Sequence, residues 1–187
     1  MRSESVVTYV ISADDKISFV DEGWCDFARA NDGDDLLPPR IIGQSLWQHI
    51  SDPTTADLYR QIITRIRSGS SSQFTLRCDG PSCRLLLEMT ITGQPDGSVE
   101  FSTRPISLEE RDPIDLLSRR APRSSQRLRV CAWCNRVDAG SGSDDWVEVE
   151  EATERLKLFE LEELPQLTHG ICNDCHATMK AKIAAKG

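Results

Sequence analysis

The sequence predicts an α+β protein: an antiparallel five-stranded sheet with short helices, followed by a small cysteine-bearing domain. The first observation is an order of elements in which strand-forming segments lie on both sides of helical patterns. The second is a pair of C-x-x-C motifs near the end of the chain. The third is a composition of 39% hydrophobic residues with a net charge of −8, which is typical of a folded, soluble, acidic protein.

The bulk properties favour a cytoplasmic protein. The 187 residues are enough for one domain of ordinary size and a small appendage. No run of about 18 apolar residues is present, so the sequence predicts no membrane span. The start of the chain lacks the apolar stretch of a signal peptide. Grouped cysteines without such a signal are typical of metal ligands in a reducing compartment.

The first thirty residues are predicted to form two strands and a helix. Residues 5–20 carry β-forming residues on both sides of a turn at Asp14 and Asp15. Residues 21–30 place three apolar side chains at positions i, i+3 and i+4, which is the spacing of one helix face.

The middle of the chain is predicted to continue with helices and then strands. Residues 42–50 are interpreted as a short helical turn, and residues 54–67 as a helix because apolar residues recur every four positions. Three strands separated by turn sequences are predicted after this helix, over Gln73–Arg77, Arg84–Thr92 and Ser98–Thr103.

One segment carries a family resemblance. Ile42-Gly-Gln-Ser-Leu-Trp47 leads through Ser51-Asp-Pro53 into the helix of residues 54–67. This pattern resembles a PAS domain, and the resemblance covers about residues 5–106. It implies a sensory and interaction module whose sheet and short helices enclose a small ligand, and it implies self-association as a homodimer.

The resemblance leaves the occupant of that pocket open. Some PAS domains bind haem through a histidine on the longer helix, but residues 54–67 contain none. His49 lies on the preceding helical turn, and we interpret it as a packed or surface residue. No flavin-type cysteine motif surrounds Cys25, so we expect the domain to purify without a chromophore.

Residues 108–129 are predicted to be a linker, or a short helix followed by a linker. This stretch separates residues 1–107, the PAS-like domain, from residues 130–187, the second domain. Few apolar residues recur in this stretch. It contains the concentrated basic run of the chain, which is Arg119, Arg120, Arg123, Arg127 and Arg129.

Four cysteines form the candidate metal site: Cys131, Cys134, Cys172 and Cys175. The two C-x-x-C pairs are separated by 37 residues. Two such turns can supply four thiolates in a tetrahedron, the geometry that Zn²⁺ prefers. A site closed by four sulfur ligands has no position for water or substrate, so the zinc is predicted to be structural.

Alternatives to this ligand set remain open. His169 or His176 can replace a cysteine, or His169 can orient a ligand through a hydrogen bond. Disulfides or a redox-active C-x-x-C are the other interpretations of the thiols. Arg129 and Arg136 flank the first pair and can compensate the charge of the thiolates.

The segment from Cys131 to Cys175 carries a second resemblance. A C-x-x-C, a tryptophan before an acidic helix, and Thr168-His-Gly-Ile-Cys-x-x-Cys175 together resemble a zinc-ribbon-like unit appended to bacterial PAS-type and other signalling proteins. A short final helix that contains Lys180, Lys182 and Lys186 is expected to close the chain.

No catalytic motif is present in the sequence, so we expect a non-enzymatic signalling protein that contacts protein partners through the zinc module. The alternative is a transcription regulator that binds DNA through this module and the arginine-rich linker. A thiol redox sensor is a further alternative.

The charge of residues 138–163 opposes DNA binding, because this segment contains two bases, Arg155 and Lys157, against ten acids. The acids are Asp138, Asp144, Asp145, Glu148, Glu150, Glu151, Glu154, Glu160, Glu162 and Glu163.

Overall fold

The computed structural model describes residues 6–31, 33–140 and 145–185. Asp144 and Lys186, which the predictions above include, lie outside these residues. The described chain divides into two compact units. The first unit contains the residues up to Thr75 together with Leu87–Ile106, and the second contains Leu76–Leu86 and Ser107–Ala185.

The first unit is built on a five-stranded sheet with the order β2-β1-β5-β4-β3. This confirms the predicted α+β class and five-stranded sheet. Two short 3-10 helices, Asp34–Leu36 and Leu46–Gln48, lie between α1 and α2 in the sequence. The main elements are β1 (Val7–Ile11), β2 (Ile17–Val20), α1 (Glu22–Ala30), α2 (Pro53–Arg67), β3 (Ser71–Arg77), β4 (Cys83–Gly93) and β5 (Val99–Glu110).

Two aspartates begin the helices of this unit. Asp21 accepts hydrogen bonds from the backbone N–H of Trp24, at 2.7 Å, and of Thr8, at 2.8 Å, so one carboxylate caps α1 and joins it to β1. Asp52 accepts from the backbone N–H of Thr55 at 2.7 Å and caps α2. A proline at the first position of α2 supports the same start. A backbone N–H at this position has no partner within a helix, so proline loses no hydrogen bond there.

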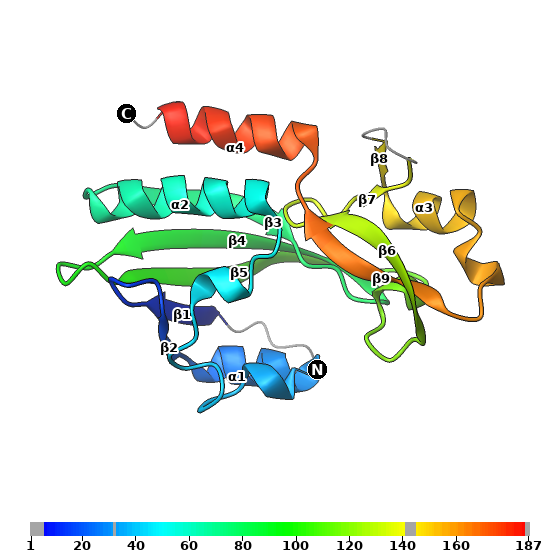
Figure 1. Cartoon of the computed structure of the whole chain (residues 1–187), viewed down its shortest axis with the longest axis horizontal. Helices are drawn as coiled ribbons and strands as arrows, with labels where there is room; N and C mark the ends of the chain where they lie inside the picture. The colour runs from blue at the N-terminus through cyan, green and yellow to red at the C-terminus, as the bar shows by residue number, and fades with distance from the viewer. Residues whose placement is uncertain (1–5, 32, 141–144, 186–187) are drawn as a thin grey trace. The chain divides into compact units, whose positions relative to one another are not determined.

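Helix α2 lies beside the sheet of the first unit (Figure 1). Leu58, Ile62, Ile63 and Ile66 of this helix are all at most 3% exposed. A Cβ atom on Gly93, at the end of β4, would lie 2.8 Å from the carbonyl oxygen of Ile66. Glycine at this position therefore allows the strand to approach the end of the helix.

Aromatic rings fill the interior between α1 and the sheet. Tyr9 stacks on Phe101 with ring centroids 4.6 Å apart and meets Trp24 edge to face at 5.4 Å. Burial raises the pKa of Tyr9 well above its usual value and raises the pKa of Tyr59 to about 12. Both phenols are therefore neutral near pH 7.

The second unit contains a four-stranded sheet with the order β8-β7-β6-β9. Strands β6 and β9 run parallel, whereas β7 pairs antiparallel with β6 and with β8. A buried apolar cluster joins the sheet to α3. The elements are β6 (Arg123–Cys131), β7 (Val137–Asp138), β8 (Trp146–Val147), α3 (Val149–Arg155), β9 (Leu164–Gly170) and α4 (Asn173–Ala185).

The linker prediction for residues 108–129 is wrong. Strand β5 continues to Glu110, a 3-10 helix covers Asp115–Leu117, and β6 begins at Arg123. Leu116 is 1% exposed and belongs to the apolar cluster of the second unit. The scarcity of apolar residues in this stretch predicted a linker. The stretch is nevertheless part of the second unit, through the buried Leu116 and the parallel pairing of β6 with β9.

The predicted boundary at residue 107 also misses part of the second unit. Leu76–Leu86, the hairpin that joins β3 to β4, belongs to the second unit. The backbone N–H of Arg77 donates to the carbonyl of Trp133 at 2.8 Å, and that of Ile114 to the carbonyl of Pro81 at 2.9 Å. Strands β3, β4 and β5 therefore each contribute residues to both units.

Ion pairs attach this hairpin to the start of α3. Asp79 has a fully buried side chain and pairs with the guanidinium groups of Arg77 and Arg111. Arg77 also binds Glu148 at 2.8 Å, and Arg111 binds Glu150 at 3.0 Å. We call these five residues the buried ion network. They are separated by up to 73 positions in the sequence (77 to 150), so no local pattern predicts their meeting.

Across residues 6–31, 33–140 and 145–185, no helix has the length and apolar character needed to cross a membrane.

Candidate metal centre

The four predicted metal ligands lie where the parallel strands β6 and β9 end. Cys131 is the last residue of β6, and it is paired with Gly170, the last residue of β9. Cys134 follows in the turn after β6. Cys172 lies between β9 and α4, and Cys175 lies in the first turn of α4. The strand pairing thus brings together two C-x-x-C turns that are far apart in the sequence.

The sulfur atoms have the spacing of a tetrahedral metal site. All four Sγ atoms lie within 4.8 Å of one another, and those of Cys134 and Cys172 are 3.7 Å apart. A Zn–S bond of about 2.3 Å places two sulfurs of a tetrahedron about 3.8 Å apart. The donor set and its spacing therefore fit Zn²⁺. We call these four side chains the thiol cluster.

The backbone around the thiol cluster turns towards the sulfurs. The backbone N–H groups of Cys172 and Cys175 lie 3.4 Å from the Sγ atoms of Cys131 and Cys172 respectively, and donate to them. Asn135 adopts φ = 61°, a left-handed conformation that asparagine tolerates, and its N–H donates to the carbonyl of Cys131 at 3.0 Å. These contacts hold the turns in the shape that directs their thiols inward.

Arg136 contacts two sulfurs of the thiol cluster. Its Nε donates to Cys134 Sγ and its Nη2 to Cys172 Sγ, both at 3.3 Å, and Nη2 also binds Asp174 at 2.7 Å. Hydrogen bonds with the neighbouring Cys131 and Cys175 thiols, and then with Arg136, lower the pKa of Cys134. The arginine is therefore placed to compensate part of the formal charge of −2 that four thiolates would leave around a bound Zn²⁺.

Arg129, the other arginine predicted to compensate charge, has different partners. Its guanidinium binds Asp138 at 3.3 Å and lies 5.0 Å from the ring centroid of Trp146. Charge compensation by Arg136 was predicted from its position beside Cys134. Its bond to Asp174 was not, because that aspartate lies between Cys172 and Cys175, 38 residues further along the chain.

The histidines are not part of the thiol cluster. In the part of the chain that the structure describes, the group of potential metal ligands contains four cysteines and no histidine. His169 is exposed and is paired with Val130 in the sheet. Its role in orienting a ligand by a hydrogen bond stays a prediction.

The three scattered cysteines lie elsewhere. Cys25 is buried in α1, Cys83 begins β4, and Cys78 lies in the hairpin; none of these described thiols forms a disulfide. Burial raises the pKa of the Cys78 thiol, which keeps it protonated. His49 follows the 3-10 helix Leu46–Gln48, and its backbone N–H donates to the carbonyl of Leu46.

Replacing Arg136 with methionine is expected to weaken zinc binding about 10- to 100-fold, because groups that hydrogen-bond to metal ligands contribute this much to metal affinity. Competition with a chromophoric chelator measures the change. The matched control is Arg129→Met, which removes an arginine that binds Asp138 and not the sulfurs. Equal affinities for the two variants would show that Arg136 does not support the metal.

Comparisons with known proteins give structural likenesses at low sequence identity. A domain of an HTR-like protein from Haloarcula marismortui is 12% identical, with a TM-score of 0.37, and covers 56% of this chain and 100% of that one. The photoactive yellow protein domain of the sensor histidine kinase Ppr from Rhodospirillum centenum is 17% identical, with a TM-score of 0.36, over 53% of this chain and 83% of that one.

A PAS domain of an HTR-like protein from Haloarcula marismortui is 16% identical, with a TM-score of 0.33, over 56% of this chain and 84% of that one. No family model matches the sequence. No curated protein matches it either.

Proposed function

We propose that the protein is a non-enzymatic signalling adaptor. Its first unit acts as a PAS-like sensory and interaction module, and its second unit contacts protein partners. The observation that carries the proposal is the thiol cluster, in which four Sγ atoms lie within 4.8 Å of one another. Four protein ligands complete the tetrahedron of a zinc ion, so the site serves structure and not catalysis.

The thiol cluster supports this role through its effect on folding. Structural zinc contributes about 10–16 kcal/mol of apparent binding free energy. The second unit has short strands and a small apolar cluster, so the metal is a large part of what orders it. A unit ordered in this way presents a rigid surface to another protein.

The contacts of the arginine-rich segment favour the adaptor over a DNA-binding regulator. Arg123 donates to the carbonyl oxygens of Leu116, Ser118 and Pro165 at 2.7–2.8 Å, so its guanidinium holds the fold together. Arg129 is paired with Asp138. Arg123 therefore directs its charge into the protein, and Arg129, which is exposed, has its charge paired with an acid. A DNA-binding face needs clustered positive charge that is accessible.

Two measurements test the proposal: sedimentation of the protein and its titration with DNA. We expect the zinc-loaded protein to self-associate in sedimentation experiments, as the PAS resemblance implies. We also expect any affinity for genomic DNA fragments at about 150 mM salt to be weak and without sequence preference. Sequence-selective DNA binding with a dissociation constant near or below about 10⁻⁸ M would overturn the adaptor in favour of a transcription regulator.

The proposed sensory role predicts a first unit that purifies without haem or flavin, with any ligand in its interior being small and colourless. The observation behind this is a helix α2 without histidine, beside an interior of stacked aromatic rings. An absorption spectrum of the purified protein is the measurement. A Soret or flavin band that elutes with the protein would contradict the expectation, and His49→Ala would then be the first variant to make.

A further inference from the structure

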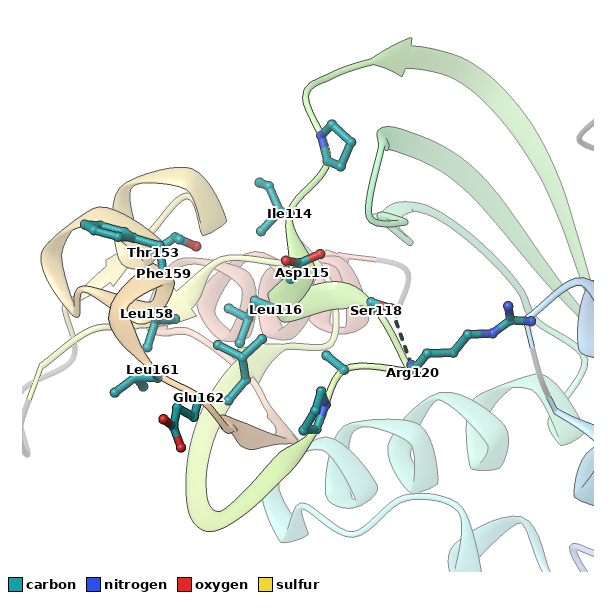
Figure 2. A pocket seen from close by; sticks show the side chains of 14 residues that line it. Ile114, Asp115, Leu116, Ser118, Arg120, Thr153, Leu158, Phe159, Leu161 and Glu162 are labelled. Atoms are coloured by element: carbon teal, nitrogen blue, oxygen red, sulfur yellow. Dashed lines mark hydrogen bonds between the residues drawn. The ribbon is translucent and has the colours of Figure 1, made fainter.

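A groove of about 500 Å³ lies in the second unit (Figure 2), and the residues that line it include none of the four cysteines of the thiol cluster. It is bounded by the stretch before β6, the start of β9 and the 3-10 helix Leu158–Glu160. Its apolar lining residues are mainly branched or aromatic: Ile114, Leu116, Leu158, Phe159, Leu161 and Leu164. The volume is within the range of about 300–1,000 Å³ that is usual for binding pockets.

Part of this apolar lining is exposed. The side chain of Phe159 is 70% exposed and that of Leu161 is 45% exposed, whereas Leu158 is 4% exposed. Lys157 adopts a left-handed conformation with φ = 50°, and the 3-10 helix begins directly after it. This turn places Leu158 in the core and leaves Phe159 outside. Single exposed apolar residues are common, but two of them beside an apolar groove are typical of an interaction site.

The charges around the groove are mainly negative. Asp115 and Glu162 line it, and Glu163 is exposed beside it. Glu160 is also exposed there, and it is paired with Lys157 at 3.8 Å. Arg120 also lines the groove, but its side chain extends away from the apolar residues in Figure 2. Arg123 lies nearby with its guanidinium bound to three backbone carbonyls. The groove therefore combines an apolar floor with an acidic rim.

We propose that this groove docks a basic amphipathic segment of a partner protein. The apolar side chains of that segment pack against Phe159 and Leu161, and its lysines or arginines face Asp115 and Glu162. Complementary charge sets the orientation and rate of such an encounter, and burial of the apolar anchors supplies the affinity. An acidic ligand meets repulsion at the same rim. The proposal rests on the adaptor function, because it names the chemistry of the partner.

Three labelled peptides of equal length test it against the full-length, zinc-loaded protein. One has leucine and lysine in an amphipathic helical pattern, the second has glutamate in place of lysine, and the third has serine in place of leucine. We expect the leucine–lysine peptide to bind at least tenfold more tightly than either of the others. Equal binding of the lysine–serine peptide would mean non-specific attraction to an acidic protein and would overturn the proposal.

Variants locate the binding. Combining Phe159→Ser with Leu161→Ser is expected to weaken binding of the leucine–lysine peptide at least tenfold, and Glu162→Gln is expected to weaken it by a smaller factor. Phe19→Ser, which changes a phenylalanine that is 51% exposed in the first unit, is the matched control and should leave binding unchanged. Unchanged binding by the Phe159 and Leu161 double variant would contradict the proposal.

Two further readouts separate this proposal from the function on which it rests. Zinc content is measured for every variant: a zinc-free wild type contradicts the adaptor function, whereas a zinc-loaded wild type that fails to bind the peptide contradicts only the groove. Sedimentation of the double variant identifies the occupant. A wild-type dimer that is lost in this variant would show that a second copy fills the groove, which overturns the assignment to a partner protein.

Discussion

Replacing Cys172 with serine is expected to abolish zinc binding and to unfold the second unit. Cys172 is 1% exposed, and its Sγ accepts hydrogen bonds from Arg136 and from the backbone of Cys175. Loss of one ligand from a closed site removes most of the roughly 10–16 kcal/mol that the metal contributes. This loss is comparable with the total stability of about 5–15 kcal/mol of an ordinary domain.

Amide hydrogen exchange will show how far the unfolding extends. We expect protection to be lost over residues 76–86 and 107–185, because these residues form the second unit, and to be kept in β1 and α2. The hairpin is included because its backbone bonds to Trp133, between the two cysteines of the first pair. Cys25→Ser, which changes a buried cysteine of α1, is the control and should retain zinc. Retention of zinc by the Cys172 variant would contradict the expectation.

Replacing Asp79 with alanine is expected to destabilise the second unit by about 3–5 kcal/mol, which is the usual cost of removing one partner from a buried ion pair. Its side chain is fully buried, and it accepts from the guanidinium of Arg77 and from the backbone N–H of Leu85 at 3.3 Å. The variant leaves Arg111, whose side chain is 8% exposed, without its contact to Asp79. Urea denaturation followed by tryptophan fluorescence is the measurement.

The control for this experiment is Asp145→Ala. Asp145 also pairs with an arginine of the second unit, Arg155, at 2.9 Å, but both side chains are 48% exposed. Exposed ion pairs contribute at most about 1 kcal/mol, so this variant should be nearly as stable as the wild type. Equal effects of the two substitutions would show that the buried ion network does not stabilise the hairpin.

Periodicity predicted the local elements of the first unit well. Helix α2 was predicted from apolar residues at four-residue spacing, and it spans Pro53–Arg67. Strand β5 was predicted to end at Thr103 but continues to Glu110. Apolar and polar residues alternate poorly in the last part of this strand, because that part leaves the first unit. A period of two arises only where one face of a strand is buried.

The second unit was predicted less well, because its order depends on contacts between distant residues. The spacing of the cysteines predicted the thiol cluster, since C-x-x-C turns are local and their chemistry is specific. The parallel pairing of β6 with β9, which brings those turns together, joins segments about 40 residues apart, for example Leu128 and Leu167. The Arg77–Glu148 pair spans 71 positions, and no sequence period reports such a contact.

The metal content of the wild-type protein is the most direct test for a zinc ion in the thiol cluster. Native mass spectrometry of protein purified without chelator is expected to show one zinc ion per chain. Replacement of that zinc by Co²⁺ should give the visible absorption of tetrahedral thiolate coordination, and the variant with serine at Cys131, Cys134, Cys172 and Cys175 should bind neither metal. A wild type without zinc, or the same zinc content in the four-serine variant, would show that the thiol cluster is not a zinc site.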